Sequence, residues 1–286
     1  MFVQTRRITR PATLDDRKRL SYLIHFETYV HRHLDYRPPL DWVGYYPFLV
    51  LEQGNEIISA LACPPDPPQV AWIRLFTTVY HYSVDQAWQT LWPFAYGELQ
   101  EEYHPGWVAA IPMQQWFASL LEKSDFQFTH SIVTLSWDRS SLPEIIKLNG
   151  VTIRPMALDD LKAVRAIDAA AFVPIWQNSE AYLEVAFRQA SMATVAEQNG
   201  ALVGYQISTA TPMGGHLARL AVLPLNQGRG LGYALLHNLL TQFSRRGARS
   251  ITVNTQKDNQ ASLALYKKAG FRLTGEEYPV YQLAVK

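Results

Sequence analysis

The stretch LARLAVLPLNQGRGLGYALL, residues 217–236, joins an apolar segment to a run of leucines through a loop that holds three glycines within five residues. Beyond the loop, apolar side chains recur at the spacing of one face of a helix. They are Leu235, Leu236, Leu239, Leu240 and Phe243. The stretch therefore predicts a buried strand, a glycine-rich loop and a helix, in that order.

The spacing of the glycines limits the kinds of phosphate-binding loop to which this loop can belong. A dinucleotide fingerprint needs G-x-G-x-x-G, and a Walker A loop needs a Gly-Lys pair, whereas this loop contains Q-x-x-G-x-G at residues 227–232. Free N–H groups at a helix start can bind a pyrophosphate, and glycines let the backbone come close to it. The alternative is a plain strand-to-helix turn, which commonly uses one glycine and rarely three.

The sequence also repeats itself. RPATLDD at residues 10–16 recurs as RPMALDD at 154–160, and LLEKSDFQFT at 120–129 recurs in pattern as LYKKAGFRLT at 265–274. These matches lie in one register of 144–145 residues, which predicts two copies of one domain. We expect domains at residues 1–140 and 150–286, because a polar segment with a proline and a glycine lies between them.

Composition and charge limit the function classes. Hydrophobic residues make up 48% of the chain, as in an ordinary globular protein. Residues 1–148 hold 12 Lys and Arg against 16 Asp and Glu, whereas residues 149–286 hold 14 against 9. This surplus suits a small polyanionic ligand in the second half and is too small for nucleic acid. With one cysteine, no signal peptide and no long apolar run, we expect a cytoplasmic protein without a membrane span.

The second copy reads as an α/β sandwich. Helices are expected over residues 157–172, 179–189 and 259–269, besides the helix that follows the glycine loop. Gln198, Asn199 and Gly200 are a strong hairpin signal between two strands. Further strands are expected near residues 216–223 and 250–255, and two more near 271–274 and 280–285.

Two motifs in this half resemble the Gcn5-related N-acetyltransferases, the GNAT superfamily. The strand, Q-x-x-G-x-G loop and helix of residues 217–236 match its central motif, and NQASLALYKKAGF at 259–271 matches the motif that follows. The resemblance covers about residues 151–286, and the duplication extends it to the first half. It implies two tandem GNAT-like domains, each with a mixed, mostly antiparallel sheet flanked by helices.

The resemblance implies acetyl-CoA as co-substrate, with no metal. Backbone groups of Leu220, Ala221 and Val222 would pair with the pantetheine arm, and one N–H there would stabilise the oxyanion of a tetrahedral intermediate. The expected cofactor-binding residues are Leu220, Ala221, Val222, Gln227, Gly228, Arg229, Gly230, Leu231, Gly232, Asn254 and Asn259.

Tyr266 is the residue that the resemblance marks as catalytic, as the proton donor to the leaving thiolate. It follows Asn259 by seven residues, about two helical turns, so both side chains share a face. Without the motif, Tyr266 would be read as a half-buried core aromatic. Some relatives carry a Glu where this sequence has Asn254, so proton removal from the amine is expected through water, with His216, Glu180 or Glu184 as weak candidates.

The acceptor is expected to be a primary amine of a small molecule or peptide that attacks the thioester directly. Phe172, Trp176 and Tyr182 lie in the segment that forms the acceptor mouth in relatives, and they favour a partly apolar acceptor. No nucleic acid or membrane partner is expected, and the protein would be a monomer or homodimer. His31 and His33 are read as a solvated helix face and not as metal ligands.

The first copy is expected to be degenerate. The repeat register places Asp85 where the second copy has Gly230, and Leu121 where it has Tyr266. An aspartate would repel a pyrophosphate, so one copy would bind acetyl-CoA. The alternative for the whole protein is a catalytically silent acyl-CoA-binding regulatory protein with the same fold.

Overall fold

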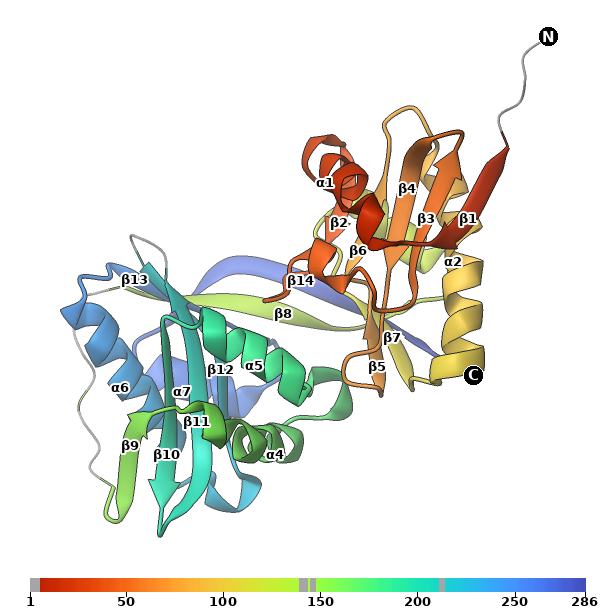
Figure 1. Ribbon diagram of the computed structural model, residues 1–286. Coiled ribbons are helices and arrows are strands. Elements are labelled where there is room, and N and C mark those ends of the chain that lie inside the picture. The colour runs from red at the N-terminus through yellow and green to blue at the C-terminus, as the bar shows by residue number, and fades with distance from the viewer. Residues whose placement is uncertain (1–5, 139–143, 145–147, 211–213) are drawn as a thin grey trace. The chain divides into compact units, whose positions relative to one another are not determined.

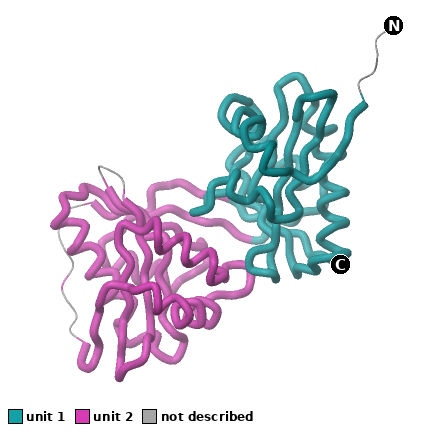
Figure 2. Tube along the Cα trace, viewed as in Figure 1, with its two compact units in different colours: residues 1–129, 279–286 teal, residues 130–278 magenta. Residues whose placement is uncertain are grey.

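The structure is a computed structural model that describes residues 6–138, 144, 148–210 and 214–286 (Figure 1). The chain divides into two compact units (Figure 2). Unit 1 comprises residues 1–129 together with 279–286, and unit 2 comprises residues 130–278. In the described parts of the chain, no helix combines the length and the apolarity needed to cross a membrane.

Unit 2 is built on a mixed sheet with the order β8-β13-β12-β11-β10-β9. Its pairs are antiparallel except β12 and β13, which run parallel. The strands are β8 (Gln127–Asp138), β9 (Val151–Pro155), β10 (Met192–Gln198), β11 (Ala201–Ala210), β12 (Gly214–Val222) and β13 (Ser250–Gln256). The helices are α4 (Leu161–Ala171), α5 (Glu180–Gln189), α6 (Leu231–Arg245) and α7 (Gln260–Lys268), with 3-10 turns at Leu158–Asp160, Pro174–Trp176 and Pro224–Asn226.

Unit 1 has a similar plan, except that an additional strand, β2, pairs with β6 and the strands fall into two runs. One sheet has the order β1-β3-β4-β6-β2, and β5, β7 and the end of β14 form a second run of strands in which β5 and β7 are parallel. The strands are β1 (Arg7–Pro11), β2 (Tyr29–Arg32), β3 (Phe48–Gln53), β4 (Glu56–Ala62), β5 (Val70–Trp72), β6 (Leu75–Thr78), β7 (Trp107–Ala110) and β14 (Arg272–Ala284). The helices are α1 (Arg17–Phe26), α2 (Val84–Glu98) and α3 (Gln115–Glu122), with 3-10 turns at Leu14–Asp16 and Pro39–Trp42 and a π-helix at Leu99–Tyr103.

Side-chain geometry supports the duplication. In unit 1, Arg10 donates Nη1 and Nη2 to Asp16 at 2.7 and 3.0 Å. In unit 2, Arg154 donates the same two atoms to Asp160 at 2.7 and 2.9 Å. Each arginine also donates Nε to a glutamate, Glu52 at 2.9 Å or Glu197 at 3.1 Å. The predicted fold class, two tandem sheet domains of mixed and mostly antiparallel strands flanked by helices, is confirmed.

The compact units do not coincide with the ranges expected from the sequence. The last strand of the chain, β14, reaches unit 1, where Tyr281 pairs with Ala110 of β7. β8, which belongs to the first copy by sequence, pairs with β13 of unit 2, Leu135 lying opposite Val253. Each unit is therefore completed by the strand that ends the other copy.

Helix and strand positions in the second copy match the expectations except at its end. The predicted hairpin at Asn199 and Gly200 is present, with φ of +52° and +78°. The prediction of two separate terminal strands is wrong, because residues 272–284 form one strand, β14. Pairing with neighbouring strands supplies hydrogen bonds to a polar segment whose own composition indicates a turn.

The interpretation of His31 and His33 as a helix face is also wrong. His31 lies in strand β2, is 1% exposed and stacks on the ring of Phe117 with 4.0 Å between centroids. His33 follows the strand and stacks on Trp72. Burial lowers the pKa of His31 to about 4, so this imidazole is neutral at physiological pH. In the parts of the chain that the structure describes, no group of three or more His, Cys, Asp or Glu side chains is placed to hold a metal.

Candidate active site

The two central strands of unit 2 separate at the position where the glycine loop begins. β12 and β13 pair from Gly214 with Ser250 as far as Leu217 with Val253. β12 then continues to Val222, paired only with β11, and β13 continues to Gln256, paired with β8. Among the described residues, the edge of β12 that faced β13 thus has no strand partner over residues 218–222. Leu220, Ala221 and Val222, predicted from the sequence to pair with an extended ligand, lie on this edge.

The glycine loop ends in a helix start with unsatisfied donors. Gly228 and Gly230 have φ of +74° and +86°, and Gly230 is the N-cap of α6. A residue with a Cβ would be strained at both positions. Among the described residues, no acceptor meets the backbone N–H groups of residues 228–233, and the first such bond runs from Ala234 to the Gly230 carbonyl at 2.9 Å. Free N–H groups and the positive end of a helix dipole are the features that favour an anion at a helix start.

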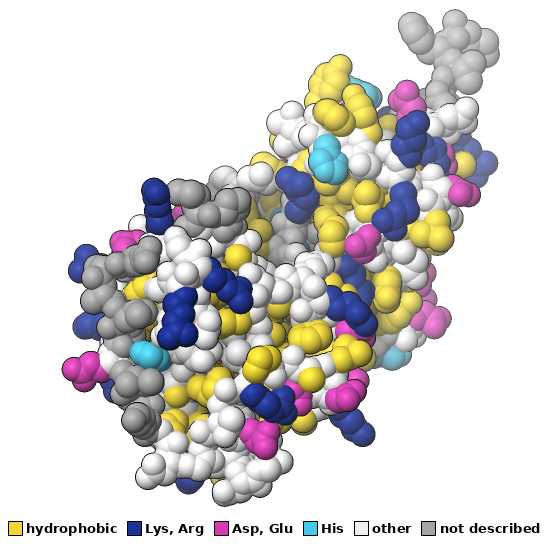
Figure 3. All heavy atoms as spheres, turned by 60° about the vertical axis from the view of Figure 1, so that its left-hand side comes forward, with side chains coloured by type: hydrophobic (Ala, Val, Ile, Leu, Met, Phe, Trp, Pro, Cys, Tyr) yellow, Lys and Arg dark blue, Asp and Glu magenta, His cyan; other side chains and the backbone are white. Residues whose placement is uncertain are grey.

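Neighbouring contacts hold this loop in place. Gln227 donates Nε2 to the Val222 carbonyl at 3.0 Å, which ties the loop to the end of β12. Asn226 donates to Gln198 at 3.1 Å, which ties it to the β10–β11 hairpin. Leu231 is 3% exposed and anchors the first turn of α6 in the core. Arg229 is exposed, and its predicted contact with a cofactor stays a prediction. On the face drawn in Figure 3, basic and acidic side chains are interspersed.

Tyr266 lies in α7, and its side chain is buried in the apolar cluster that α6 and α7 form with the sheet. It is 5% exposed, and its ring lies 5.6 Å from that of Phe271. Burial raises the pKa of its hydroxyl well above the ordinary value of a tyrosine, so the group stays protonated at neutral pH. Within the described residues its hydroxyl has no hydrogen-bond partner. Its predicted role as a proton donor stays a prediction.

Asn259 caps a helix, a role that the sequence motif does not predict. It is the N-cap of α7, and its Oδ1 accepts a bond from the Ser262 N–H at 3.1 Å. Its Nδ2 donates to Gln256 at 3.3 Å. The carboxamide is thus largely engaged within the protein. Its predicted contact with a cofactor stays a prediction.

The residues considered for proton removal are placed differently from one another. Asn254 is exposed on the part of β13 where pairing with β12 has stopped. His216 Nδ1 lies 2.9 Å from the Thr252 hydroxyl, across the paired part of the two strands, and burial lowers its pKa. Glu184 accepts two bonds from Arg188, at 2.9 and 2.6 Å, on the surface of α5. Glu180, in the first turn of the same helix, is exposed.

A buried ionic network that sequence reasoning missed holds the predicted acceptor segment against β12. Asp168, at 0% exposure, accepts bonds from the Tyr205 hydroxyl at 2.5 Å and from Arg219 Nε at 2.8 Å. Arg219 also donates Nη2 to the Trp176 carbonyl, and its guanidinium lies 3.6 Å from the centroid of the Phe172 ring. Two signals were available in the sequence: a lone arginine in an apolar strand and a lone aspartate in an apolar helix.

Phe172 and Trp176 are therefore brought together with β12 through Arg219. Tyr182 stands in the first turn of α5, where its N–H donates to the N-cap Ser179 at 3.0 Å. The Trp176 ring packs edge-on against His130 at 5.4 Å. These contacts fix the shape of the segment on unit 2.

The corresponding helix start in unit 1 is chemically different. α2 begins at Ser83, whose side chain accepts the Gln86 N–H at 3.4 Å. Asp85 lies in the first turn and pairs with Lys123 at 2.6 Å. A side-chain cap and a carboxylate occupy the place where unit 2 has free N–H groups.

Comparison with known proteins relates unit 2 to a family. The model of the Acetyltransferase (GNAT) family matches residues 161–271, from the start of α4 to Phe271 beyond α7. N-alpha-acetyltransferase RimI of Mycobacterium tuberculosis is 37% identical over 93 residues, which are 31% of this chain and 57% of that protein. The ribosomal protein bS18-alanine N-acetyltransferase of Escherichia coli is 34% identical over 74 residues, 26% of this chain and 50% of that protein. The chain thus spans little more than half the length of these relatives.

Solved structures match nearly the whole chain. A tandem GNAT protein from the clavulanic acid biosynthesis pathway has a TM-score of 0.65 at 15% identity and covers 98% of both chains. A Gcn5-related N-acetyltransferase from Sphaerobacter thermophilus has a TM-score of 0.63 at 15% identity, with 98% of this chain and 96% of that chain covered. At such identity the likeness concerns the fold. Residues 161–271 therefore form a domain of the GNAT acetyltransferase family, and the chain that carries it has the fold of a tandem GNAT protein.

Proposed function

We propose that the protein is an N-acetyltransferase that moves the acetyl group of acetyl-CoA to a primary amine of a small molecule or peptide. The observation that carries this proposal is the end of β12–β13 pairing at Leu217 and Val253, beside a helix start with free N–H groups. An extended chain with a pyrophosphate at one end fits such an arrangement: the strand edge would bind the chain and the loop would bind the phosphates.

The cofactor contacts follow from this arrangement. The backbone of residues 220–222 would pair with the pantetheine arm, and the N–H groups of residues 228–232 would bind the pyrophosphate. Arg229 would add charge-assisted bonds to the phosphates. Gln227 would act by holding the loop on the end of β12 through its bond to Val222. Bound acetyl-CoA supplies the acetyl group as a thioester, and an N–H of β12 would stabilise the charge that develops on its carbonyl oxygen.

Tyr266 would donate the proton that the leaving thiolate takes up. Burial keeps its hydroxyl protonated at the working pH, as a general acid must be, but it also makes the proton harder to release than that of an ordinary tyrosine. The amine would attack the thioester directly, so no covalent enzyme intermediate is needed. Cys63, the one cysteine of the chain, is buried in unit 1 and takes no part.

Proton removal from the amine would run through water. Asn254 cannot accept a proton as a carboxylate would, and Glu184 is ion-paired with Arg188. Water at the open edge between β12 and β13 would therefore carry the proton to solvent. The rate should then follow the fraction of free amine.

The acceptor would lie against Phe172 and Trp176, whose positions depend on Arg219. The curated relatives are named for acetylation of α-amino groups, one of them on an alanine of ribosomal protein bS18. An α-amino group on a partly apolar peptide end is therefore the first acceptor to test, followed by small primary amines.

One acetyl-CoA should bind per chain. The first copy presents Asp85 and a capped helix start where a pyrophosphate would have to lie, so we propose that it is a degenerate copy. Isothermal titration calorimetry with CoA should give a stoichiometry of one. A value of two would contradict the degenerate copy while leaving the transfer reaction untouched.

The test of the function is release of CoA thiol from acetyl-CoA over a panel of amines and peptides with free amino termini. Turnover that is saturable in one acceptor, together with an acetylated product in the mass spectrum, supports the proposal. CoA binding without turnover on any acceptor would favour the alternative, a silent acyl-CoA-binding regulatory protein. Failure to bind CoA would contradict both.

A further inference from the structure

The two copies differ at one side chain next to their shared Arg–Asp–Glu arrangement. In unit 1, Arg19 of α1 donates Nη2 to Asp16 at 2.5 Å and Nη1 to Glu52 at 3.0 Å. Nη1 also donates to the Asn55 carbonyl at 3.0 Å. Three acceptors thus surround a guanidinium that the chain itself supplies.

Unit 2 keeps the acceptors and lacks the guanidinium. In the repeat register, Asp160, Glu197 and Gly200 take the places of Asp16, Glu52 and Asn55, and Ala163 takes the place of Arg19. Ala163 sits one helical turn after Asp160 on α4, as Arg19 does after Asp16. The methyl group of an alanine cannot reach the carboxylates.

The carboxylates of unit 2 are correspondingly more open to solvent. The Asp160 side chain is 12% exposed, against 1% for Asp16. Glu197 is 33% exposed, against 19% for Glu52. Arg154 is the one cationic partner that they share in the described part of unit 2, whereas Asp16 and Glu52 share two.

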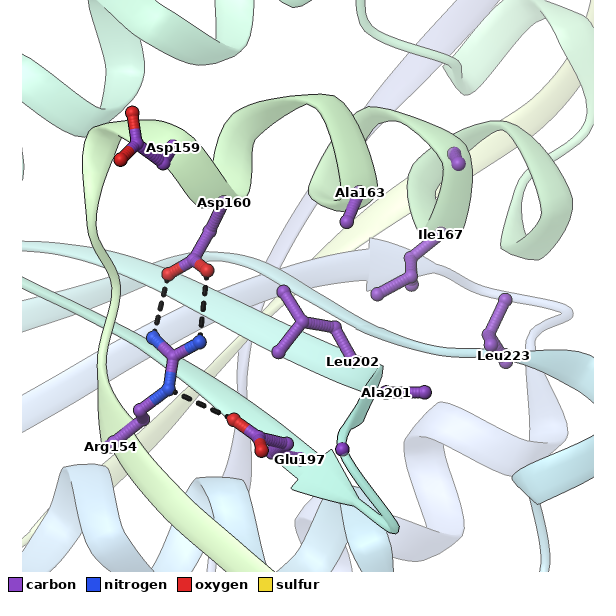
Figure 4. Close-up of a pocket in the computed structure, with 11 residues that line it drawn as sticks. Arg154, Asp159, Asp160, Ala163, Ile167, Glu197, Ala201, Leu202 and Leu223 are labelled. Atoms are coloured by element: carbon purple, nitrogen blue, oxygen red, sulfur yellow. Dashed lines mark hydrogen bonds and ion pairs between the residues drawn. The ribbon is translucent and has the colours of Figure 1, made fainter.

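A pocket of about 510 Å³ opens at this place (Figure 4). Figure 4 shows Asp160 and Glu197 on either side of Arg154, and the apolar side chains of α4 and β11 beyond them. Its polar lining contains three carboxylates and one guanidinium, from Asp159, Asp160, Glu197 and Arg154. Its apolar lining is Ala163, Ala166, Ile167, Ala201, Leu202 and Leu223.

We propose that this pocket binds the guanidinium group of an alkylguanidine, in the place that the Arg19 side chain fills in unit 1. The forked donors of the ligand would bond to Asp160 and Glu197 and to the Gly200 carbonyl, as those of Arg19 bond to their counterparts. The alkyl chain would lie on Ala163 and Ile167. The ligand would restore the second cation that balances these carboxylates in unit 1.

The site is separate from the proposed catalytic centre. Neither Tyr266 nor any residue of the glycine loop lines the pocket. Tyr266 belongs to the apolar cluster under α6 and α7, to which α4 contributes no side chain. Binding here can therefore be measured whether or not the protein transfers acetyl groups.

The probe is propylguanidine, which reproduces the arginine side chain, titrated into the full chain by calorimetry or by chemical-shift changes. A ligand of this size should bind with a dissociation constant on the order of 1 mM. Propylurea has the same shape without the charge and should not bind. A second titration uses the peptide acetyl-Gly-Arg-Gly-amide. If both compounds bind, the pocket accepts the arginine side chain of a peptide. If propylguanidine alone binds, the natural ligand is a free small molecule.

Two variants locate the binding. Ala163→Arg supplies the guanidinium internally and should abolish binding while raising the melting temperature. Lys162→Arg, one residue earlier on α4, is the matched control and should bind as the wild type does. Glu197→Gln should weaken binding about tenfold or more, since it removes a charged acceptor.

The reciprocal change tests the same relationship in unit 1. Arg19→Ala should open a matching site, so that propylguanidine raises the melting temperature of this variant more than that of the wild type. The proposal is overturned if propylurea binds as well as propylguanidine, if binding survives Ala163→Arg, or if no saturable binding occurs.

Discussion

Asp168 and Arg219 form an ion pair with 2.7 Å between Oδ2 and Nη2, and the Asp168 side chain has no exposed surface. Its other oxygen accepts the N–H of Asn178 at 2.8 Å, so one carboxylate links α4, β12 and the segment that follows α4. The pair thus determines where Phe172 and Trp176 lie. A residue that touches no reacting atom can in this way set the geometry of the proposed acceptor site.

Asp168→Ala should lower the free energy of unfolding by about 3–5 kcal/mol, because it leaves Arg219 and the Tyr205 hydroxyl without their buried partner. Denaturant unfolding measures this loss. Glu184→Ala, which breaks the exposed pair with Arg188, is the control and should leave the stability nearly unchanged. Equal effects of the two substitutions would contradict the structural role of Asp168.

Tyr266→Phe should lower kcat about 100-fold or more while leaving the affinity for CoA unchanged, since it removes the proton donor and keeps the ring. Because burial raises the pKa of Tyr266, the wild-type rate should show no loss from its ionisation around pH 10. Steady-state kinetics and calorimetry check the two parts. A variant that keeps full activity would exclude the hydroxyl from the reaction.

Gly230 and Gly247 stand at opposite ends of α6 with nearly the same backbone, φ of +86° and +85°. Replacing either by alanine should cost about 1 kcal/mol of stability, because both residues adopt the left-handed conformation. Only Gly230→Ala should weaken CoA binding, since it lies at the N-terminus of the helix. The ratio of the two CoA dissociation constants separates a binding effect from simple strain.

His31 should make the stability fall between pH 6.5 and pH 4. Its folded pKa of about 4 lies below that of an unfolded histidine, so the unfolded state binds a proton first as the pH drops. Well above pH 6.5, protonation of His31 does not reduce the free energy of unfolding. At pH 4 it reduces the free energy of unfolding by about 3 kcal/mol. Unfolding of His31→Gln at several pH values should show a shallower fall than wild type, whereas His25→Gln, an exposed site, should not differ.

Fragments cut at the seam of the repeat should fold poorly. A fragment of residues 1–140 lacks the strand segment that pairs with β7, and a fragment of residues 150–286 lacks β8, the partner of β13. Circular dichroism and thermal melts of each fragment check this. Mixing the two fragments should restore a cooperative transition, and a stable fragment of residues 150–286 alone would contradict the importance of β8.

The local elements of unit 2 could be predicted because their signals are local. The glycine loop and the hairpin at Asn199 and Gly200 each follow from residue types that favour one backbone conformation. The repeat predicts the same fold for the first half of the chain, although that half lacks the two motifs found in the second half.

What the sequence could not show depends on contacts between distant residues. The Asp168–Arg219 pair joins positions 51 residues apart, and although each residue is unusual in its segment, the sequence does not show that the two pair with each other. The exchange of β8 and β14 likewise depends on strand partners, which periodicity does not identify. The prediction for His31 is wrong because a histidine beside an arginine resembles a solvated surface, whereas its ring stacks on Phe117 in the core.

The place of β14 also bears on the order in which the protein is made. The residues that complete the sheet of unit 1, 279–286, are synthesised after the whole of unit 2, whereas the strand β8 needed by unit 2 is synthesised before most of that unit. Domains usually fold in the order of synthesis. Here the half that is synthesised first completes its sheet only after the second half has been made, so the first half cannot finish folding in the order of synthesis.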